Sequence, residues 1–359
     1  MNWQLSNLLR AIAITLVIWI HASHPWWFGA HGTVSLDSLN WEVFIDTAIN
    51  QVGRFTVPLF VILSGFGLAK SEQSRPFQLW GFIQRRGFRI LPPYLFFTLL
   101  NLAFRQEFQL GNWVEKLGQI AIALRDGSGD YHLYFLTIII QCYISYPLLR
   151  RIPFTGWNLA IAAVFTLSMF TLRWAVSLFH WLPDLAPYLP NSNHWMFWLP
   201  YFLFGIWLAK VPDWFTEALQ RCSTQVWGCL WAIAAALELG EFYFSAIRIG
   251  SAEAVGHYGR PTVVLLTITF LLWAMSWKPQ NEPDSPPRFP QFNTLIERLG
   301  NASFTTYLLH TQVLRLITPT QVLGGIGYLL IAAIASWAIG LLVWAIVKPV
   351  KGLNVIFGA

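Results

Sequence analysis

The sequence predicts an all-α integral membrane protein, a polytopic helical bundle with about ten transmembrane helices. Of its 359 residues, 55% are hydrophobic and only 11% are charged, whereas about 25% of the residues of a soluble domain are charged. The hydrophobic residues gather in separate runs close to the roughly 20 residues that a helix needs to cross about 30 Å of hydrocarbon. The 20 Trp and 28 Phe residues fit a membrane protein, because Trp favours the headgroup level of a bilayer.

Ten hydrophobic runs meet this length criterion, and we assign them to one domain that covers residues 1–359. The predicted spans are approximately 8–27, 52–70, 90–108, 131–149, 156–174, 195–210, 224–245, 261–277, 302–318 and 323–347. An even number of spans places both termini on one side of the membrane. Most of the 23 Lys and Arg residues fall in cytoplasmic loops if that side is the cytoplasm, so the positive-inside rule predicts cytoplasmic termini.

The formal net charge of +6 is therefore explained by basic residues in cytoplasmic loops, and we expect no nucleic-acid partner. The first run is too long for the apolar region of a signal peptide, so it is predicted to be a retained span. The three cysteines lie in or beside apolar runs without metal-ligand spacing, so we expect no metal site and no permanently bound cofactor. The proline-rich inner loop 278–299 predicts an extended tether, and Pro92 and Pro93 are expected in the first turn of the third span.

Arg10 and His21 lie in the first span, eleven residues apart. Eleven steps of 100° end about 20° from three full turns, so the two side chains share a helix face and are about 16 Å apart along the axis. An ionisable group deep in a membrane costs free energy unless it faces protein or water, which favours a functional interpretation. The alternative is a histidine that only forms a hydrogen bond with a neighbouring helix.

The second and third spans carry further polar candidates. Arg54 lies in the second span, and the pair Ser64-Gly65 allows another helix backbone to approach closely. Arg85, Arg86 and Arg89 precede the third span on its cytoplasmic side. Guanidinium groups in this pattern can bind phosphate oxygens through charge-assisted hydrogen bonds. The same arginines could instead anchor the protein to anionic lipid.

Two later spans add a second deep histidine. His132 and Tyr134 lie at the outer start of the fourth span, and Tyr307 and His310 lie one turn apart in the ninth. A helix that enters near residue 302 places His310 about 12 Å into the membrane. His21 and His310 can each donate or accept a proton near neutral pH, which predicts a polar site inside the bundle.

In order and spacing these residues resemble the membrane acyltransferase-3 family, the O-acyltransferases of bacterial polysaccharides, lipopolysaccharide and other envelope glycans. The likeness extends over nearly the whole chain and is weakest in spans five to eight. It rests on Arg10 followed by His21, on Gly53-Arg54-Phe55-Thr56-Val57-Pro58-Leu59-Phe60 leading to Ser64-Gly65-Phe66, on Arg86-x-x-Arg89, on His132-Leu133-Tyr134-Phe135, and on Gly300-x-x-Ser303-x-x-x-Tyr307-Leu308-Leu309-His310.

The resemblance implies a multi-pass protein of the bacterial inner membrane. Such a protein takes an acyl group, usually acetyl, from cytoplasmic acyl-CoA and delivers it to a hydroxyl of an envelope polysaccharide or glycolipid. It implies that His21 is the catalytic histidine, that Arg10 is its partner, and that Arg86 and Arg89 belong to the donor end. The chain ends at Ala359 without the hydrolase-like domain that some members carry, so separate glycan-assembly proteins are expected as possible partners.

The remaining candidates are assigned by position. We group Arg85 and Ser64 with the acyl-CoA site, His310 with catalysis, and four residues with the acceptor: Arg54, His132, Tyr134 and Tyr307. The imidazole of His21 could act as a general base or could itself carry the acyl group. Two other functions remain open: a transporter or flippase of a glycan or lipid-linked sugar, in which the same residues would guide substrate or protons, and a scaffold for glycan assembly.

Overall fold

The computed structural model describes residues 1–27, 41–179, 194–277, 290–317 and 324–359. All regular secondary structure in these ranges is helical, which confirms the predicted all-α class for them. The helices that form the body of the bundle are α1 (Trp3–Trp27), α3 (Thr56–Ser74), α4 (Leu79–Ala103), α7 (Tyr134–Leu149), α8 (Gly156–Phe179), α9 (Trp195–Leu208), α11 (Thr224–Ile249), α13 (Pro261–Ser276), α14 (Pro290–Leu316) and α15 (Gly324–Val347). Shorter helices connect them: α2 (Trp41–Val52), η2 (Gly53–Phe55), α5 (Gln106–Leu110), α6 (Trp113–Asp126), α10 (Asp213–Gln220), α12 (Ala252–Val255) and α16 (Leu353–Ile356).

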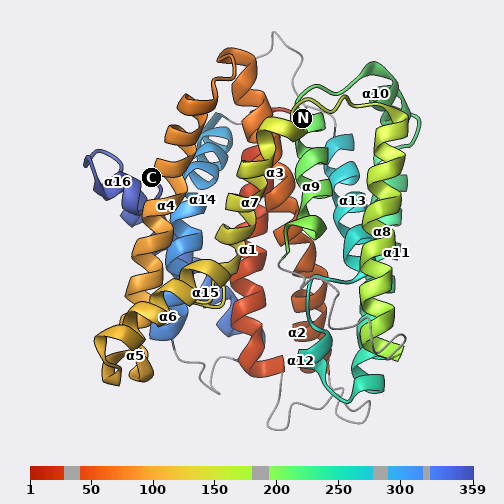
Figure 1. The fold of residues 1–359 in the computed structure, drawn as a ribbon. Helices are drawn as coiled ribbons and strands as arrows, with labels where there is room; N and C mark the ends of the chain where they lie inside the picture. Colours follow the sequence, from red (N-terminus) through yellow and green to blue (C-terminus); the bar gives the residue numbers. More distant parts are fainter. Residues whose placement is uncertain (28–40, 180–193, 278–289, 318–323) are drawn as a thin grey trace.

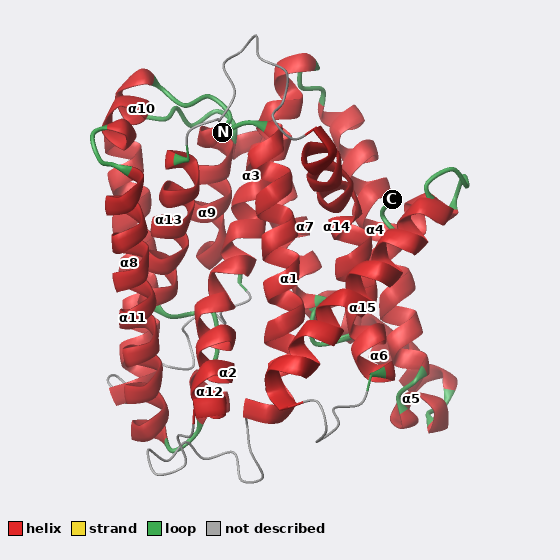
Figure 2. Cartoon of the chain, turned by 180° about the vertical axis from the view of Figure 1, so that it is seen from behind, coloured by secondary structure: helices red, strands yellow, loops and turns green. Residues whose placement is uncertain are grey.

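The helices of the body stand side by side, as Figures 1 and 2 show from opposite directions. Helices α1, α3 and α7 lie in the middle, with α4, α14 and α15 on one side and α8, α11 and α13 on the other. We call the end at which α1 begins the proximal end. The other end, where α2, α5, α6 and α12 lie (Figure 1), is the distal end.

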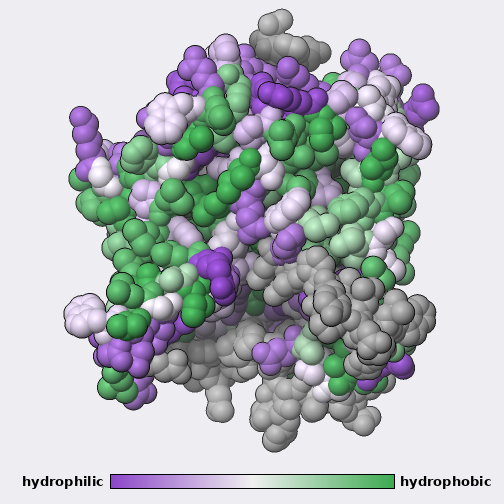
Figure 3. Space-filling model, in the orientation of Figure 1, coloured by the Kyte–Doolittle hydropathy of each residue, from purple (hydrophilic) through white to green (hydrophobic). Residues whose placement is uncertain are grey.

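Each predicted span overlaps a helix of the described structure, in chain order α1, α3, α4, α7, α8, α9, α11, α13, α14 and α15. Among the residues that the structure describes, five segments are long and apolar enough to cross a membrane: Trp3–Ser23, Trp41–Ser74, Gly156–Phe179, Thr224–Ile249 and Gly325–Val347. Hydrophobic side chains cover much of the middle height of the face in Figure 3, and hydrophilic ones gather along its upper margin. The chain is thus a helical membrane protein, while ten crossings and cytoplasmic termini stay predictions.

Two helices differ in extent from the predicted spans that they contain or overlap. Helix α4 begins at Leu79 and ends at Ala103, so the predicted range 90–108 starts and stops too late, and Pro92 and Pro93 lie inside the helix instead of in its first turn. Helix α14 begins at Pro290, well before 302, so the second half of the predicted tether is helical. Residues 278–289 lie outside the described residues. Helix α14 begins with a largely polar turn, and the apolar first turn of α4 is separated from the predicted span by Gln84, Arg85, Arg86 and Arg89, so a search for long apolar runs does not include these starts.

Close packing of α3 against α9 fixes the helix that carries Ser64. A Cβ atom added to Gly65 would overlap the carbonyl oxygen of Phe202, and one added to Gly205 would overlap the carbonyl oxygen of Ile62. The two backbones therefore touch through glycines, as small residues allow in membrane helices. This confirms the close backbone approach predicted at Gly65. Because α3 is held on one face by α9, its other face can line a cavity.

Candidate functional site

A cavity of about 1400 Å³ opens among the proximal ends of α1, α3, α4, α7 and α14. Its wall contains Arg10 from α1 together with Arg86 and Arg89 from α4. The fold thus brings together the arginines that the sequence assigned to the donor end, although they are far apart in the chain. Two further cations, Lys70 and Arg75, line the same cavity from the end of α3. In the sequence they appeared only as cytoplasmic basic residues, and nothing in their spacing pointed to a ligand.

Ser64 lines this cavity, and its hydroxyl lies 3.0 Å from the hydroxyl of Tyr143, which is also in the wall. Arg85 does not line it. Its side chain is exposed and folds back over Gly81, where an added Cβ would lie 2.9 Å from the guanidinium Nη1. It also borders a small separate pocket beside Arg86. The structure therefore places Arg86, Arg89 and Ser64 in one cavity and leaves Arg85 outside it.

An ion pair between Glu72 of α3 and Arg150 lies beside the small pocket. Arg150 donates hydrogen bonds to the Glu72 carboxylate, which also accepts one from Tyr146 at 2.6 Å. These contacts join the proximal end of α3 to that of α7, and both helices form walls of the arginine-lined cavity.

The inner end of the cavity is apolar except for Tyr307. Phe60, Phe135 and Leu136 line it with this tyrosine. The Tyr307 hydroxyl donates a hydrogen bond to the backbone oxygen of His132, and the Tyr307 backbone oxygen is bonded to Nδ1 of His310. Tyr307 thus borders the cavity and contacts two of the predicted site histidines.

Three histidines meet on the distal side of Tyr307, and we call His21, His132 and His310 the histidine cluster. The ring centroids of His21 and His310 are 5.3 Å apart, and those of His132 and His310 are 5.2 Å apart. His132 and His310 are fully buried, whereas His21 is half-buried with the ring of Tyr131 4.7 Å away. The fold therefore unites the three histidines from α1, α14 and the turn before α7.

Asp130 joins the cluster, and sequence reasoning missed it. One carboxylate oxygen of Asp130 lies 3.3 Å from Nδ1 of His132, and the other lies 3.0 Å from the Arg315 guanidinium. The side chain is buried. Burial would raise the pKa of Asp130, but His132 and Arg315 outweigh burial and hold that pKa below its usual range. Its position two residues before His132 was the available signal.

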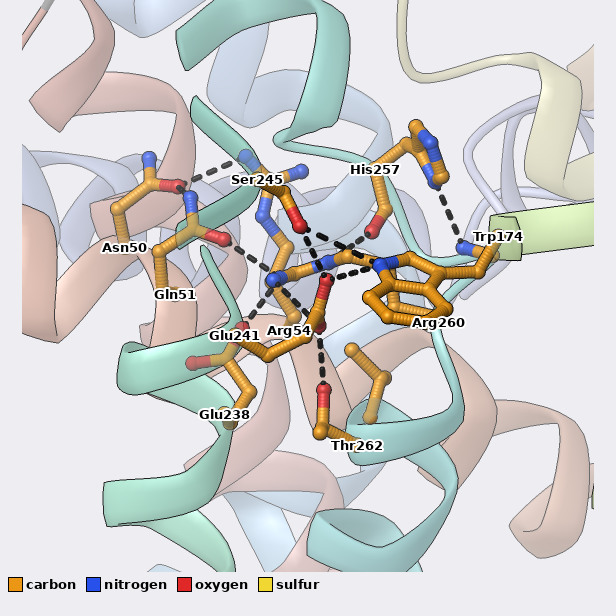
Figure 4. Close-up of polar contacts among 12 residues, drawn as sticks. Asn50, Gln51, Arg54, Trp174, Glu238, Glu241, Ser245, His257, Arg260 and Thr262 are labelled. Carbon is orange, nitrogen blue, oxygen red and sulfur yellow. Dashed lines mark hydrogen bonds and ion pairs between the residues drawn. The ribbon is translucent and has the colours of Figure 1, made fainter. Parts of the chain in front are cut away.

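A second buried polar group lies in the distal half between α2, α11 and α13, and Figure 4 shows it. We call Arg260, Glu238, Glu241 and Gln51 the Arg260 cluster. The Arg260 guanidinium, about 1% exposed, donates to both carboxylates and to the Gln51 side chain at 2.7 Å. Glu241 also accepts hydrogen bonds from three neighbouring side chains: Trp174, Ser245 and Thr262.

Arg54 and Tyr134, two predicted acceptor contacts, lie beside this second group and do not line the cavity. Arg54 donates to Asn50 at 2.7 Å and sits over the ring of Tyr258 at 5.1 Å. The ring of Tyr134 is 6.5 Å from that of Tyr258. Asn50 in turn donates to the backbone oxygen of Ile20 at 3.0 Å, one residue before His21. The group therefore braces the helix that carries His21.

His257 borders the Arg260 cluster (Figure 4), where its backbone oxygen accepts a hydrogen bond from Arg260. Burial, followed by the nearby charge of Arg260, lowers the pKa of His257 to about 3. His257 lies outside the histidine cluster and does not line the arginine-lined cavity. It provides a histidine against which variants of the histidine cluster can be compared.

Comparison with known families agrees with the arrangement of these residues. A family model described as an acyltransferase domain, that of the acyltransferase-3 family, matches residues 5–347. The chain belongs to the acyltransferase-3 family. As a member it is an acyltransferase, and the matched range contains both the arginine-lined cavity and the histidine cluster. No curated protein and no solved structure matches the chain.

Proposed function

We propose that this acyltransferase-3 protein transfers an acyl group, in the simplest case acetyl, from cytoplasmic acyl-CoA to a hydroxyl of an envelope polysaccharide or glycolipid. It would act in the bacterial inner membrane, with the proximal end of the bundle toward the cytoplasm. The observation that carries the proposal is the position of Tyr307, which borders the arginine-lined cavity and is bonded to His132 and His310 on its other side.

The cavity suits a multiply phosphorylated donor. Within the described part of the chain, Arg10, Arg86 and Arg89 form no ion pair with a carboxylate, so their guanidinium groups can bind phosphate oxygens. CoA carries phosphates at one end and a thioester at the end of a long pantetheine arm. We infer that the phosphates lie among these arginines and that the arm reaches the apolar inner end of the cavity.

The distance between Arg10 and His21 along α1 indicates that the two residues have different roles. Arg10 is about 16 Å from His21 along the helix axis and lines the cavity. It therefore suits a donor phosphate better than an oxyanion that forms beside His21. His21 lies against His310, where an imidazole could deprotonate the acceptor hydroxyl or carry the acyl group between donor and acceptor.

The direct test uses purified protein in lipid nanodiscs with labelled acetyl-CoA and an extract of envelope glycans. We expect release of CoA and transfer of label to a glycan, with a rate that falls at least about 100-fold in His21→Ala. His257→Gln is the matched control, because it alters a buried histidine outside the cluster, and it should retain the wild-type rate. Wild-type protein that moves unmodified glycan across a membrane without CoA release would instead establish a transporter. Full function of His21→Ala would favour a scaffold.

A second experiment identifies the products. Envelope glycans from a strain that lacks this protein are compared by mass spectrometry with those from strains complemented by wild type or by His21→Ala. We expect an acyl mass on one glycan only in the wild-type complement. Its mass and position name the acyl group and the acceptor hydroxyl, and identical glycans in all three strains would contradict the proposal.

A further inference from the structure

The hydrogen bonds of the histidine cluster determine which ring nitrogens carry protons. Nδ1 of His310 is bonded to the backbone oxygen of Tyr307, and a carbonyl oxygen can only accept a hydrogen bond. Nδ1 of neutral His310 therefore carries the proton, and Nε2 holds a lone pair. That Nε2 is buried and has no hydrogen-bond partner among the described residues.

His132 has a charged group beside its ring in place of a hydrogen bond. Its Nδ1 lies 3.3 Å from a carboxylate oxygen of Asp130, and this negative charge favours a proton on Nδ1, but the pair does not have hydrogen-bond geometry. Both ring nitrogens are buried with no hydrogen-bond partner in the described ranges. The Tyr307 hydroxyl also donates to the His132 backbone oxygen. Both the backbone and the ring of His132 are thus held, while one nitrogen stays available to accept a proton.

The carboxylate distinguishes His132 from His310. A carboxylate at Nδ1 fixes the tautomer of an imidazole and stabilises the imidazolium that forms when Nε2 accepts a proton. At His310 the Nδ1 partner is a neutral carbonyl. The charged or titratable groups around His132 are Asp130 and Tyr131 in its own turn and Tyr307, His310 and Arg315 from α14. His21 from α1 lies against His310 and Tyr131.

We propose that His132 is the base that takes the proton of the acceptor hydroxyl, and that Asp130 is the positioning residue that holds His132 in this role. This inference rests on the proposed function. The hydroxyl oxygen forms a bond to the acyl carbon and its proton moves to Nε2 of His132. When CoA is the direct donor, the bond between the acyl carbon and the CoA sulfur breaks, the sulfur leaves with the electron pair, and the proton on His132 passes through water to the thiolate. When His21 carries the acyl group, the bond between the acyl carbon and the His21 nitrogen breaks instead, and the imidazole leaves with the electron pair.

Asp130 also contacts Arg315, so a test must separate catalysis from a purely structural contact between the turn and α14. Asp130→Asn keeps the size of the side chain and removes its charge. Arg315→Gln is the matched control, because it removes the contact with α14 and leaves Asp130 beside His132. His132→Gln removes the proposed base. Each variant is purified in nanodiscs, and its folded fraction is measured by size-exclusion chromatography.

The assay follows CoA release from acetyl-CoA, in the presence of envelope glycan extract, over a range of pH. We expect kcat to fall about 100-fold or more in Asp130→Asn and His132→Gln, with KM for acetyl-CoA unchanged. In Asp130→Asn the acidic limb of the pH profile moves to lower pH, because the charge that stabilises the protonated imidazole has gone. Arg315→Gln stays within about fivefold of wild type, as for a half-exposed ion pair.

Equal losses in Asp130→Asn and Arg315→Gln, with an unchanged pH profile, would show that Asp130 is only structural and overturn the inference. A His132→Gln variant with the wild-type kcat would also overturn the inference. Both outcomes are measured against a wild type that releases CoA, so they would overturn the role of His132 and Asp130 without overturning the proposed function. A wild type that releases no CoA would overturn the proposed function itself, and the assignment of His132 with it.

Discussion

The histidine cluster and the Arg260 cluster both bury ionisable groups in the distal half of the bundle, yet their hydrogen bonding differs. The Arg260 guanidinium is bonded to two carboxylates, to the amide oxygen of Gln51 and to a backbone oxygen. In the histidine cluster, Nε2 of His132 and Nε2 of His310 have no hydrogen-bond partner among the described residues. The Arg260 cluster pairs its cation with two carboxylates and leaves one buried acceptor, Oε2 of Glu238, without a partner among the described residues, whereas the histidine cluster leaves ring nitrogens of two histidines without one.

This difference suggests that the Arg260 cluster contributes to the stability of the fold and the histidine cluster to the reaction. A buried polar atom without a partner costs about 1–3 kcal/mol, so a site that keeps two such nitrogens gives up stability that the Arg260 cluster gains. Groups poised to accept protons are expected at functional sites. The Arg260 cluster, in contrast, joins α2, α11 and α13 and reaches α1 through Asn50. We expect changes to the first cluster to alter activity and changes to the second to alter stability.

The largest effect is expected for His310→Asn. The asparagine amide can still donate to the backbone oxygen of Tyr307, but Nε2 is lost. His310 lies between His21 and His132, so its loss disturbs both, and the rate of acetyl-CoA turnover should fall about 10²–10⁴-fold, as for loss of acid–base catalysis, while the protein stays folded. Turnover is measured as CoA release with envelope extract present. An unchanged rate would show that His310 is only structural. It would contradict the expectation that the histidine cluster, unlike the Arg260 cluster, takes part in the reaction.

Arg260→Met should have the largest effect on stability. It leaves Glu238 and Glu241 buried without their cation, and breaking a buried pair in this way costs about 3–5 kcal/mol. The free energy of unfolding is measured by denaturant titration of the purified protein, and the folded fraction should retain wild-type turnover.

The triple variant Arg260→Met, Glu238→Met and Glu241→Met is the control. Replacing a whole buried ion group by apolar side chains is often neutral or stabilising, so this variant should regain most of the loss. Reduced turnover in folded Arg260→Met would show that the Arg260 cluster takes part in the reaction.

At the donor end we expect smaller effects, confined to binding. Arg86→Gln or Arg89→Gln removes a charged hydrogen bond worth about 1.5–3 kcal/mol, so KM for acetyl-CoA should rise roughly 10- to 150-fold with little change in kcat. Arg85→Gln is the matched control, because its side chain lies outside the cavity, and its KM should stay within about twofold of wild type. Equal KM values in all three variants would contradict the proposal that the arginines of the cavity bind the phosphates of the donor.

Ser64→Ala should have the smallest effect. It removes the contact with the Tyr143 hydroxyl, and a neutral hydrogen bond contributes about 0.5–1.5 kcal/mol. We expect acetyl-CoA turnover to fall by no more than about tenfold. Tyr143→Phe removes the other hydroxyl of the same contact, and its turnover rate in steady-state kinetics should equal that of Ser64→Ala. A loss of 100-fold in Ser64→Ala alone would make Ser64 a participant in the chemistry.

Residues inside the apolar spans were the most predictable from sequence. His21 and Arg10 were recognisable because an ionisable group in a hydrophobic run is costly and therefore conspicuous, and helical spacing placed them on one face. His310 followed by the same reasoning. That α14 brings His310 against His21 could not be derived, since helical periodicity describes one helix and does not identify its neighbours.

Residues outside the runs were less predictable. Asp130 and Arg260 are charged residues in connecting segments, where charged side chains are usually solvated, so only their burial in the fold reveals them. Arg54 was assigned to the acceptor because it lies in a span, but it is bonded to Asn50, one turn before it, and lies over the ring of Tyr258 from a distant segment. The start of α14 was missed because its first turn is largely polar, and that of α4 because arginines separate its apolar first turn from the long apolar run.

The central claim is that one path joins the arginine-lined cavity to the histidine cluster. It is tested most directly in sealed proteoliposomes of known protein orientation, with labelled acetyl-CoA on one side and envelope glycan extract on the other. We predict that label reaches the glycan when acetyl-CoA is on the side of the cavity and the extract is opposite, and that reversing the two sides abolishes transfer. Labelling only when both substrates share one side would contradict the account.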